Sequence, residues 1–104
     1  MITLKSLINE IALVQKAIWI KTNGDIKEVE PDNGTDFTLE ECYKYTNGGP
    51  VQLINLDDDD RIMLINEEGK MRNLPINRKA TQLYNNPHDF VVGDVLICHP
   101  DQFR

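Results

Sequence analysis

Four basic side chains gather in one short stretch of an otherwise acidic chain. The 104 residues include 17 Asp and Glu against 11 Lys and Arg, for a formal net charge of −6. Yet the sequence "NEEGKMRNLPINRKA" at residues 66–80 places Lys70, Arg72, Arg78 and Lys79 around a glycine and a proline. Ammonium and guanidinium groups bind carboxylates and phosphates through charge-assisted hydrogen bonds, which are stronger than neutral ones. The 66–80 segment is therefore the first candidate for a binding surface.

Six residues of this segment make up the candidate site. They are Asn66, Glu67, Lys70, Arg72, Asn77 and Arg78. The three cations would form charge-assisted bonds to an anion or to an acidic partner, and the two asparagines would add directional polar contacts.

The same residue types also suit a purely structural role. Residues 66–69 have the composition of a tight turn with Gly69 at positive φ, and Asn77 is a suitable cap for a helix that begins at Arg78. Turn and cap chemistry does not explain the four cations, because positive charge in the first turn of a helix opposes the helix dipole. The binding interpretation and the structural one both stay open on the sequence.

Metal and catalytic chemistry have little support in the rest of the chain. The run "DDDD" at 57–60 lacks the ligand spacing and the glycine of an EF-hand loop, and it suits a polar hairpin tip. Cys98 and His99 would point to opposite faces of a strand, so they could not share one zinc ion. No phosphate-binding loop, nucleophile elbow or His-Glu-x-x-His motif occurs. We therefore expect no metal, no cofactor and no catalytic residue.

Composition and charge favour a cytoplasmic protein. No apolar run approaches the ~20 residues of a membrane helix, and the first residues lack the unbroken apolar stretch of a signal peptide. Cys42 and Cys98 form no Cys-x-x-Cys pair, and we expect both to be buried, reduced thiols.

The net negative charge of the chain disfavours direct binding to nucleic acid. It is concentrated in residues 1–60, whereas residues 61–80 carry five basic and two acidic side chains.

Hydrophobic periodicity predicts alternating helices and strands. The predicted elements are a helix over 4–15, strands over 17–22 and 25–30, a helix beginning after Thr38 and ending near Gly48, strands over 51–56 and 61–66, a helix over 78–84 and a final strand within 90–100. Asn23-Gly24 is the dipeptide favoured where both turn residues need positive φ. Thr38 and Glu41 have the spacing of a capping box, with Leu39 and Cys42 on the inner face of that helix.

This order of elements predicts an α+β fold. We expect a mainly antiparallel sheet of about five strands, with two or three helices on one face. Residues 17–104 would form the single domain, and residues 1–16 would be an N-terminal helix outside it.

Three stretches of the chain resemble one known family. "NEEGK" at 66–70, "LPINR" at 74–78 and "VVGDVLI" at 91–97 are similar to segments of a family of small phage, plasmid and bacterial proteins known as domain of unknown function 3846. The order of segments agrees from about Ala17 to Asp101. The resemblance implies an accessory gene of a mobile element, a setting in which counter-defence proteins are common, and it implies no mechanism.

Three functions remain open on the sequence. The first is a noncatalytic module that binds a host protein or a small, nucleotide-like anion through the 66–80 segment, as a monomer or a homodimer. The second is an acidic decoy that imitates DNA through Asp57–Asp60 and the Glu40-Glu41 face. The third is an enzyme, for which no residue set can be named.

Overall fold

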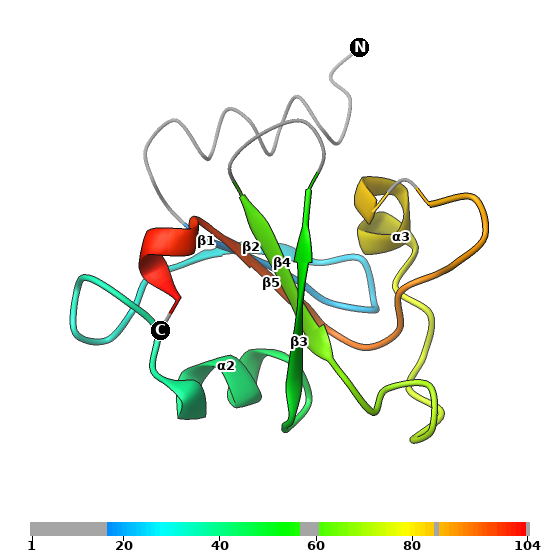
Figure 1. The fold of residues 1–104 in the computed structure, drawn as a ribbon, viewed down its shortest axis with the longest axis horizontal. Coiled ribbons are helices and arrows are strands. Elements are labelled where there is room, and N and C mark those ends of the chain that lie inside the picture. The colour runs from blue at the N-terminus through cyan, green and yellow to red at the C-terminus, as the bar shows by residue number, and fades with distance from the viewer. Residues whose placement is uncertain (1–16, 57–60, 85, 104) are drawn as a thin grey trace, which may run out of the picture.

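A five-stranded sheet forms the centre of the protein. The computed structural model describes residues 17–56, 61–84 and 86–103 (Figure 1). The strands are β1 (Ala17–Ile20), β2 (Ile26–Val29), β3 (Val51–Asn55), β4 (Ile62–Asn66) and β5 (Val95–Cys98). They lie in the order β2-β1-β5-β4-β3, and every neighbouring pair is antiparallel. The predicted α+β class with about five strands is confirmed.

Within the described residues, two helices and a short 3₁₀ turn accompany the sheet. They are α2 (Leu39–Tyr45), α3 (Arg78–Tyr84) and η1 (Pro100–Gln102). The predicted helix over 4–15 and the tip at 57–60 lie outside the described residues.

The helices cover opposite faces of the sheet, which corrects the expectation that they share one face. Met63 packs in one hydrophobic core with Ala80 of α3. Its neighbours Ile62 and Leu64 pack in a second core with Cys42 of α2. Adjacent residues of a strand point to opposite faces, so each face of the sheet has its own core.

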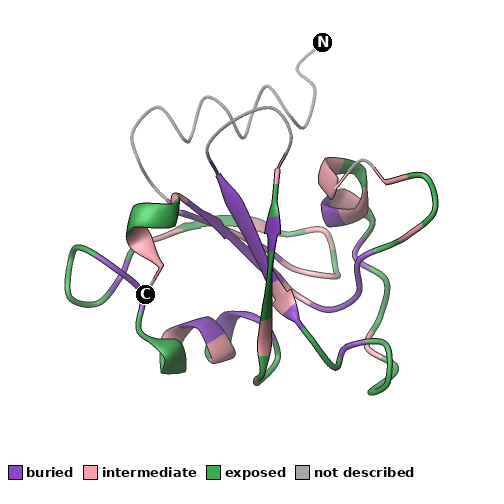
Figure 2. Cartoon of the chain, in the orientation of Figure 1, coloured by how far each residue is buried: buried purple, intermediate pink, exposed green. Residues whose placement is uncertain are grey.

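The reason for the two cores is visible in the central strands. The sequences "IMLI" at 62–65 and "VLIC" at 95–98 are apolar at every position rather than at alternate ones. A strand of this kind must be covered on both faces. Figure 2 shows β4 and β5 buried over nearly their whole length, between α2 on one side and α3 on the other.

The first hairpin forms as predicted, with a different turn. Gly24 has a φ of +96°, but Asn23 does not have a positive φ. The Gly24 N–H donates to the Lys21 carbonyl at 3.0 Å, and the Lys21 N–H donates to the Asp25 carbonyl at 2.9 Å. This is a three-residue loop that closes with a glycine bulge, so only one residue needs the left-handed conformation.

The predicted capping box of α2 is confirmed. The Glu41 N–H donates to Thr38 Oγ1 at 3.2 Å, and the Thr38 N–H donates to Glu41 Oε1 at 2.9 Å. Cys42 lies on the inner face of the helix, whereas Leu39 is half exposed, which corrects its predicted place there. Gly48, with a φ of +93°, donates its N–H back to the Tyr43 carbonyl after the helix ends.

Candidate functional site

Gly69 allows two parts of the chain to approach closely, and it does not have the positive φ that the sequence suggested. A Cβ atom at this position would lie 2.7 Å from Val92 Cγ2 and 3.2 Å from the Asn66 carbonyl oxygen. Real Cβ atoms do not come so close to a neighbouring carbon. The glycine is therefore required by packing against the segment that leads into β5.

Successive turns make the first part of the 66–80 segment a compact loop. The Gly69 N–H donates to the Asn66 carbonyl at 3.1 Å, the Arg72 N–H to the Glu68 carbonyl at 2.9 Å, and the Leu74 N–H to the Gly69 carbonyl at 3.0 Å. These bonds fix the backbone without the help of a ligand. The loop holds Met71 in solvent, with 80% of its surface exposed.

Asn66 joins this loop to the end of α2. Its side chain is almost fully buried. Nδ2 donates to the Thr46 carbonyl at 3.0 Å and to the Gly48 carbonyl at 2.8 Å, while Oδ1 accepts the Glu68 N–H at 2.8 Å. The amide therefore points into the protein and braces two loops against each other.

Asn77 has a similar position at the start of α3. Its Oδ1 accepts the Ala80 N–H at 3.1 Å, which confirms the predicted helix cap. Its Nδ2 donates to the Ile20 and Gly93 carbonyls, both at 3.0 Å. The side chain is 1% exposed, so we assign a structural role to Asn77, as to Asn66.

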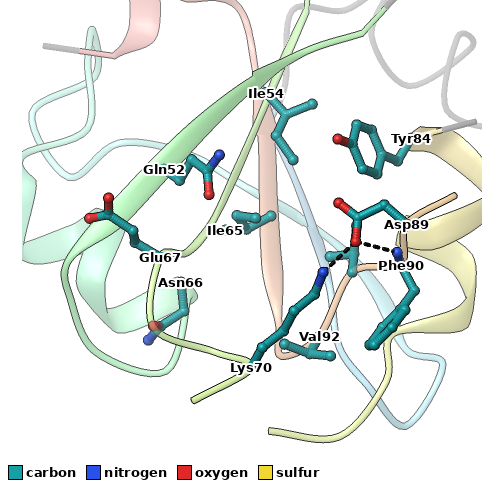
Figure 3. A pocket seen from close by; sticks show the side chains of 11 residues that line it. Gln52, Ile54, Ile65, Asn66, Glu67, Lys70, Tyr84, Asp89, Phe90 and Val92 are labelled. Atoms are coloured by element: carbon teal, nitrogen blue, oxygen red, sulfur yellow. Dashed lines mark hydrogen bonds and ion pairs between the residues drawn. The ribbon is translucent and has the colours of Figure 1, made fainter. Parts of the chain in front are cut away.

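Lys70 is engaged by its neighbours. Its ammonium donates to Asp89 and lies 4.5 Å from the centre of the Phe90 ring (Figure 3). The bond from Lys70, followed by the bond from the Phe90 N–H, lowers the pKa of Asp89. The positive charge of Lys70 is therefore neutralised by Asp89, and its ammonium group lies against the aromatic ring of Phe90.

A small hollow lies beside this ion pair. It measures about 110 Å³ and lies between β3, β4 and the chain that follows α3. Gln52, Ile54 and Tyr84 line it together with Lys70 and Asp89 (Figure 3). Pockets that enclose small molecules usually measure ~300–1,000 Å³. The hollow is therefore too small to enclose a nucleotide.

The remaining cations differ in how many of their hydrogen-bond donors are bonded within the protein. Lys79 donates to the Gly24 carbonyl, so its ammonium group is already bonded within the protein. Arg72 donates one N–H to the Asn47 carbonyl at 2.9 Å and is otherwise exposed. Arg78 is exposed and forms no ion pair with another described residue. Of the four cations, the two arginines keep most of their donors available.

Sequence reasoning missed the apolar part of this surface. Met71, Ile76 and Phe90 are exposed large hydrophobic side chains, and all three lie in or beside the 66–80 segment. Ile76 forms an isolated β-bridge with Val92, which places the 66–80 segment beside the stretch of chain that contains Phe90. The sequence signal for Met71 was an isolated apolar residue between two cations, in "KMR".

Glu67 is exposed at the edge of the hollow. The structure thus brings Glu67 and Lys70 to one hollow, holds Arg72 on the loop beside them, places Arg78 at the start of α3 and turns the two asparagines inward.

The described residues contain neither a metal-binding cluster nor a membrane-spanning helix. Within the described ranges, no three His, Cys, Asp or Glu side chains gather in a way that could hold a metal ion. No helix of the described residues is long and apolar enough to cross a bilayer. Cys42 and Cys98 are buried free thiols, as predicted.

The geometry defines a small α+β domain in which two buried asparagines brace a basic loop against the sheet. The chain belongs to the family described as domain of unknown function DUF3846, whose model matches residues 15–103. The stretches 66–70, 74–78 and 91–97, which carry the resemblance, meet around this loop. No curated protein and no solved structure matches the chain.

Proposed function

We propose that this protein is a noncatalytic binding module that presents the 66–80 segment and Phe90 to an acidic surface of another protein. The observation that carries the proposal is the combination of a fixed backbone with exposed apolar and cationic side chains. Met71 and Arg72 stand side by side on a loop that turn bonds and buried Asn66 already hold in place.

Such a loop suits a protein partner energetically. A backbone that is ordered before binding loses little further entropy in the complex. Methionine, arginine and aromatic residues are enriched in protein interfaces. An exposed Met71 would enter an apolar depression of the partner, while Arg72 and Arg78 would meet carboxylates around it.

A small nucleotide-like anion has weaker support as the ligand. The hollow near Lys70 is too small to enclose a nucleotide, and the Lys70 charge is already paired with Asp89. The DNA-mimic decoy has weaker support as well. Both carboxylate oxygens of Glu41 accept backbone N–H groups, from Thr38 and Asp32. This carboxylate is therefore already bonded within the protein.

The family resemblance suggests where the partner is found. A protein of phage or plasmid origin would act in the cytoplasm of its host, so the partner would be a host protein, and counter-defence would be one use of such binding.

The test compares three tagged chains in affinity capture from a bacterial lysate, followed by mass spectrometry. They are the wild type, the double variant Arg72→Ala/Arg78→Ala, and the control Lys27→Ala/Lys44→Ala. The control removes the same charge from exposed positions elsewhere. We expect the wild type and the control to capture a common protein that the arginine variant loses. Each lost charge-assisted bond costs about 1.5–3 kcal/mol, a tenfold to hundredfold loss of affinity.

Two outcomes would contradict the proposal. The first is equal capture by all three chains at equal thermal stability. The second is a nucleotide that raises the melting temperature of the wild type and of the control but not of the arginine variant, since a ligand that binds only the native state stabilises it by mass action. That result would replace the protein partner with a small anion.

A further inference from the structure

One edge of the sheet, β3, has regularly spaced outward backbone groups. The Pro50 carbonyl accepts the Glu67 N–H at 2.9 Å, and the Leu56 N–H donates to the Arg61 carbonyl at 3.2 Å. These bonds bracket the β3–β4 register, in which Gln52 faces Ile65 and Ile54 faces Met63. In an antiparallel pair the bonded residues alternate, so the even-numbered residues of β3 bond to β4. The N–H and C=O groups of Val51, Leu53 and Asn55 therefore point away from the sheet.

This edge is open along the described chain. β3 is the last strand in the sheet order, and Figure 1 shows it in front of the sheet with no described segment crossing it. Gln52, Leu53 and Asn55 are exposed, and Leu53 keeps 40% of its surface in solvent. A row of unpaired backbone groups on an exposed strand is a template for pairing with another strand.

The two edges of the sheet differ in charge. β2 carries Lys27 and Glu28, and Glu30 follows it directly. Charged side chains of this kind protect an edge from pairing. β3, with the sequence "VQLIN", has no charged residue at all. An uncharged edge lacks the repulsion that would keep a second copy of the same strand away.

We propose that β3 pairs antiparallel with β3 of a second copy of this chain, about a two-fold axis at Leu53. In this register each outward N–H meets an outward carbonyl. Leu53 faces Leu53 of the other copy, and Val51 faces Asn55. On the opposite face Gln52 meets Ile54. The result is a continuous ten-stranded sheet that buries Leu53, the most exposed apolar side chain of the strand.

The dimer uses a different element from the proposed partner surface. Met71 and Arg72 lie on the loop after β4 and not on the outer edge of β3, so loss of dimerisation and loss of partner binding are separate results.

The first experiment measures the mass of the full chain by light scattering across a wide range of protein concentration. We expect the wild type to change from one chain to two as the concentration rises. Leu53→Lys should remain a single chain, because two ammonium groups would meet on the axis. The control Leu39→Lys makes the same chemical change at a half-exposed position on α2 and should dimerise like the wild type. A wild type that is a single chain at every concentration overturns the proposal.

The second experiment tests the register and does not depend on the stability of the lysine variant. Residues that face each other in a bonded antiparallel pair have Cα atoms about 5.5 Å apart, within the ~4.4–6.8 Å range of a disulfide. Leu53→Cys should therefore form a reducible dimer under mild oxidation. Gln52→Cys is the matched control, since Gln52 is also exposed and lies one residue away. The diagonal separation of ~7–8 Å from its own copy is too long for a disulfide.

The native thiols do not interfere with this crosslinking experiment, because Cys42 and Cys98 are buried. Equal crosslinking of the Leu53→Cys and Gln52→Cys chains, or none in either, would reject the two-fold pairing at Leu53.

Discussion

At the scale of single residues, two amide side chains explain why the 66–80 segment has a fixed shape. An asparagine side chain offers two N–H donors and one carbonyl acceptor, so one buried residue can hold several backbone groups at once. Asn66 holds the end of α2 and the start of its own loop. Asn77 holds β1, the turn before β5 and the first turn of α3. These asparagines support the surface, and the exposed side chains beside them would make the contacts.

Removal of the Asn66 amide should therefore destabilise the protein more than removal of an exposed cation. We expect Asn66→Ala to lower the free energy of unfolding by at least about 2 kcal/mol, because the Gly48 carbonyl and the Glu68 N–H lose a buried partner. Arg72→Ala should stay within about 0.5 kcal/mol, as exposed substitutions usually do. Urea unfolding measures both. Equal stability of the two variants would contradict the bracing role of Asn66.

Gly69 offers a separate test of the close approach to Val92. Gly69→Ala should cost about 1–3 kcal/mol, because the new methyl group overlaps Val92 Cγ2. The cost should be smaller when Val92→Ala is already present, so the two changes should be non-additive in a double-mutant cycle. Additive free energies of unfolding would show that contact with Val92 is not the reason for the glycine.

At the scale of elements, α2 is fixed at its start by bonds to nearby residues and at its end by bonds from distant parts of the chain. At its start, Glu41 accepts the N–H groups of Thr38 and Asp32. At its end, the Asn47 carbonyl accepts a guanidinium N–H of Arg72, and the Asn47 Oδ1 accepts the Asp94 N–H. Because the 66–80 segment rests on this end of the helix, stability of α2 and geometry of the loop are connected.

The start of α2 should make stability depend on pH in acid. The bond from the Thr38 N–H, and then that from Asp32, lowers the pKa of Glu41 below its ordinary value of 4.5. A carboxyl whose pKa is lower in the folded state stabilises the protein fully above the unfolded pKa and loses this effect as pH falls through the folded pKa. Glu41→Gln should therefore flatten the decline in melting temperature below about pH 4.5. A decline as steep as in the wild type would contradict this contribution.

At the scale of the whole molecule, the described residues form one sheet with a separate hydrophobic core on each face. One core contains α3 and the other contains α2, Phe37 and both cysteines. The Cys42 and Cys98 thiols are neutral in this environment, since burial raises the pKa of Cys42 to about 11 and that of Cys98 to about 12.

This burial predicts slow thiol chemistry in the native state. The thiolate is the reactive form, and both thiols are neutral and shielded from solvent at pH 8. We expect a thiol reagent to modify Cys42 and Cys98 only as fast as the protein unfolds, and at once in denaturant. Labelling followed by intact mass gives the rate. Rapid modification of either cysteine in the native protein would contradict the packing of the α2 core.

The sequence by itself determined the features that depend on neighbouring residues. The capping box of α2, the asparagine cap of α3 and the first hairpin all follow from residues a few positions apart. Local hydrogen bonds and turns need only such neighbours, so their signals are present in short stretches of sequence.

Only the tertiary structure decided what the 66–80 segment presents to solvent. Asn66 turns inward because its carbonyl partners lie 18–20 residues away in sequence, and the Ile20 partner of Asn77 lies 57 residues away. The Asp89 partner of Lys70 is 19 residues away. Whether a polar side chain is bonded inside the fold or available to a ligand depends on such distant groups. The opposite placement of α2 and α3 was decided in the same way, because both faces of the central strands are apolar and each needs a cover from elsewhere in the chain.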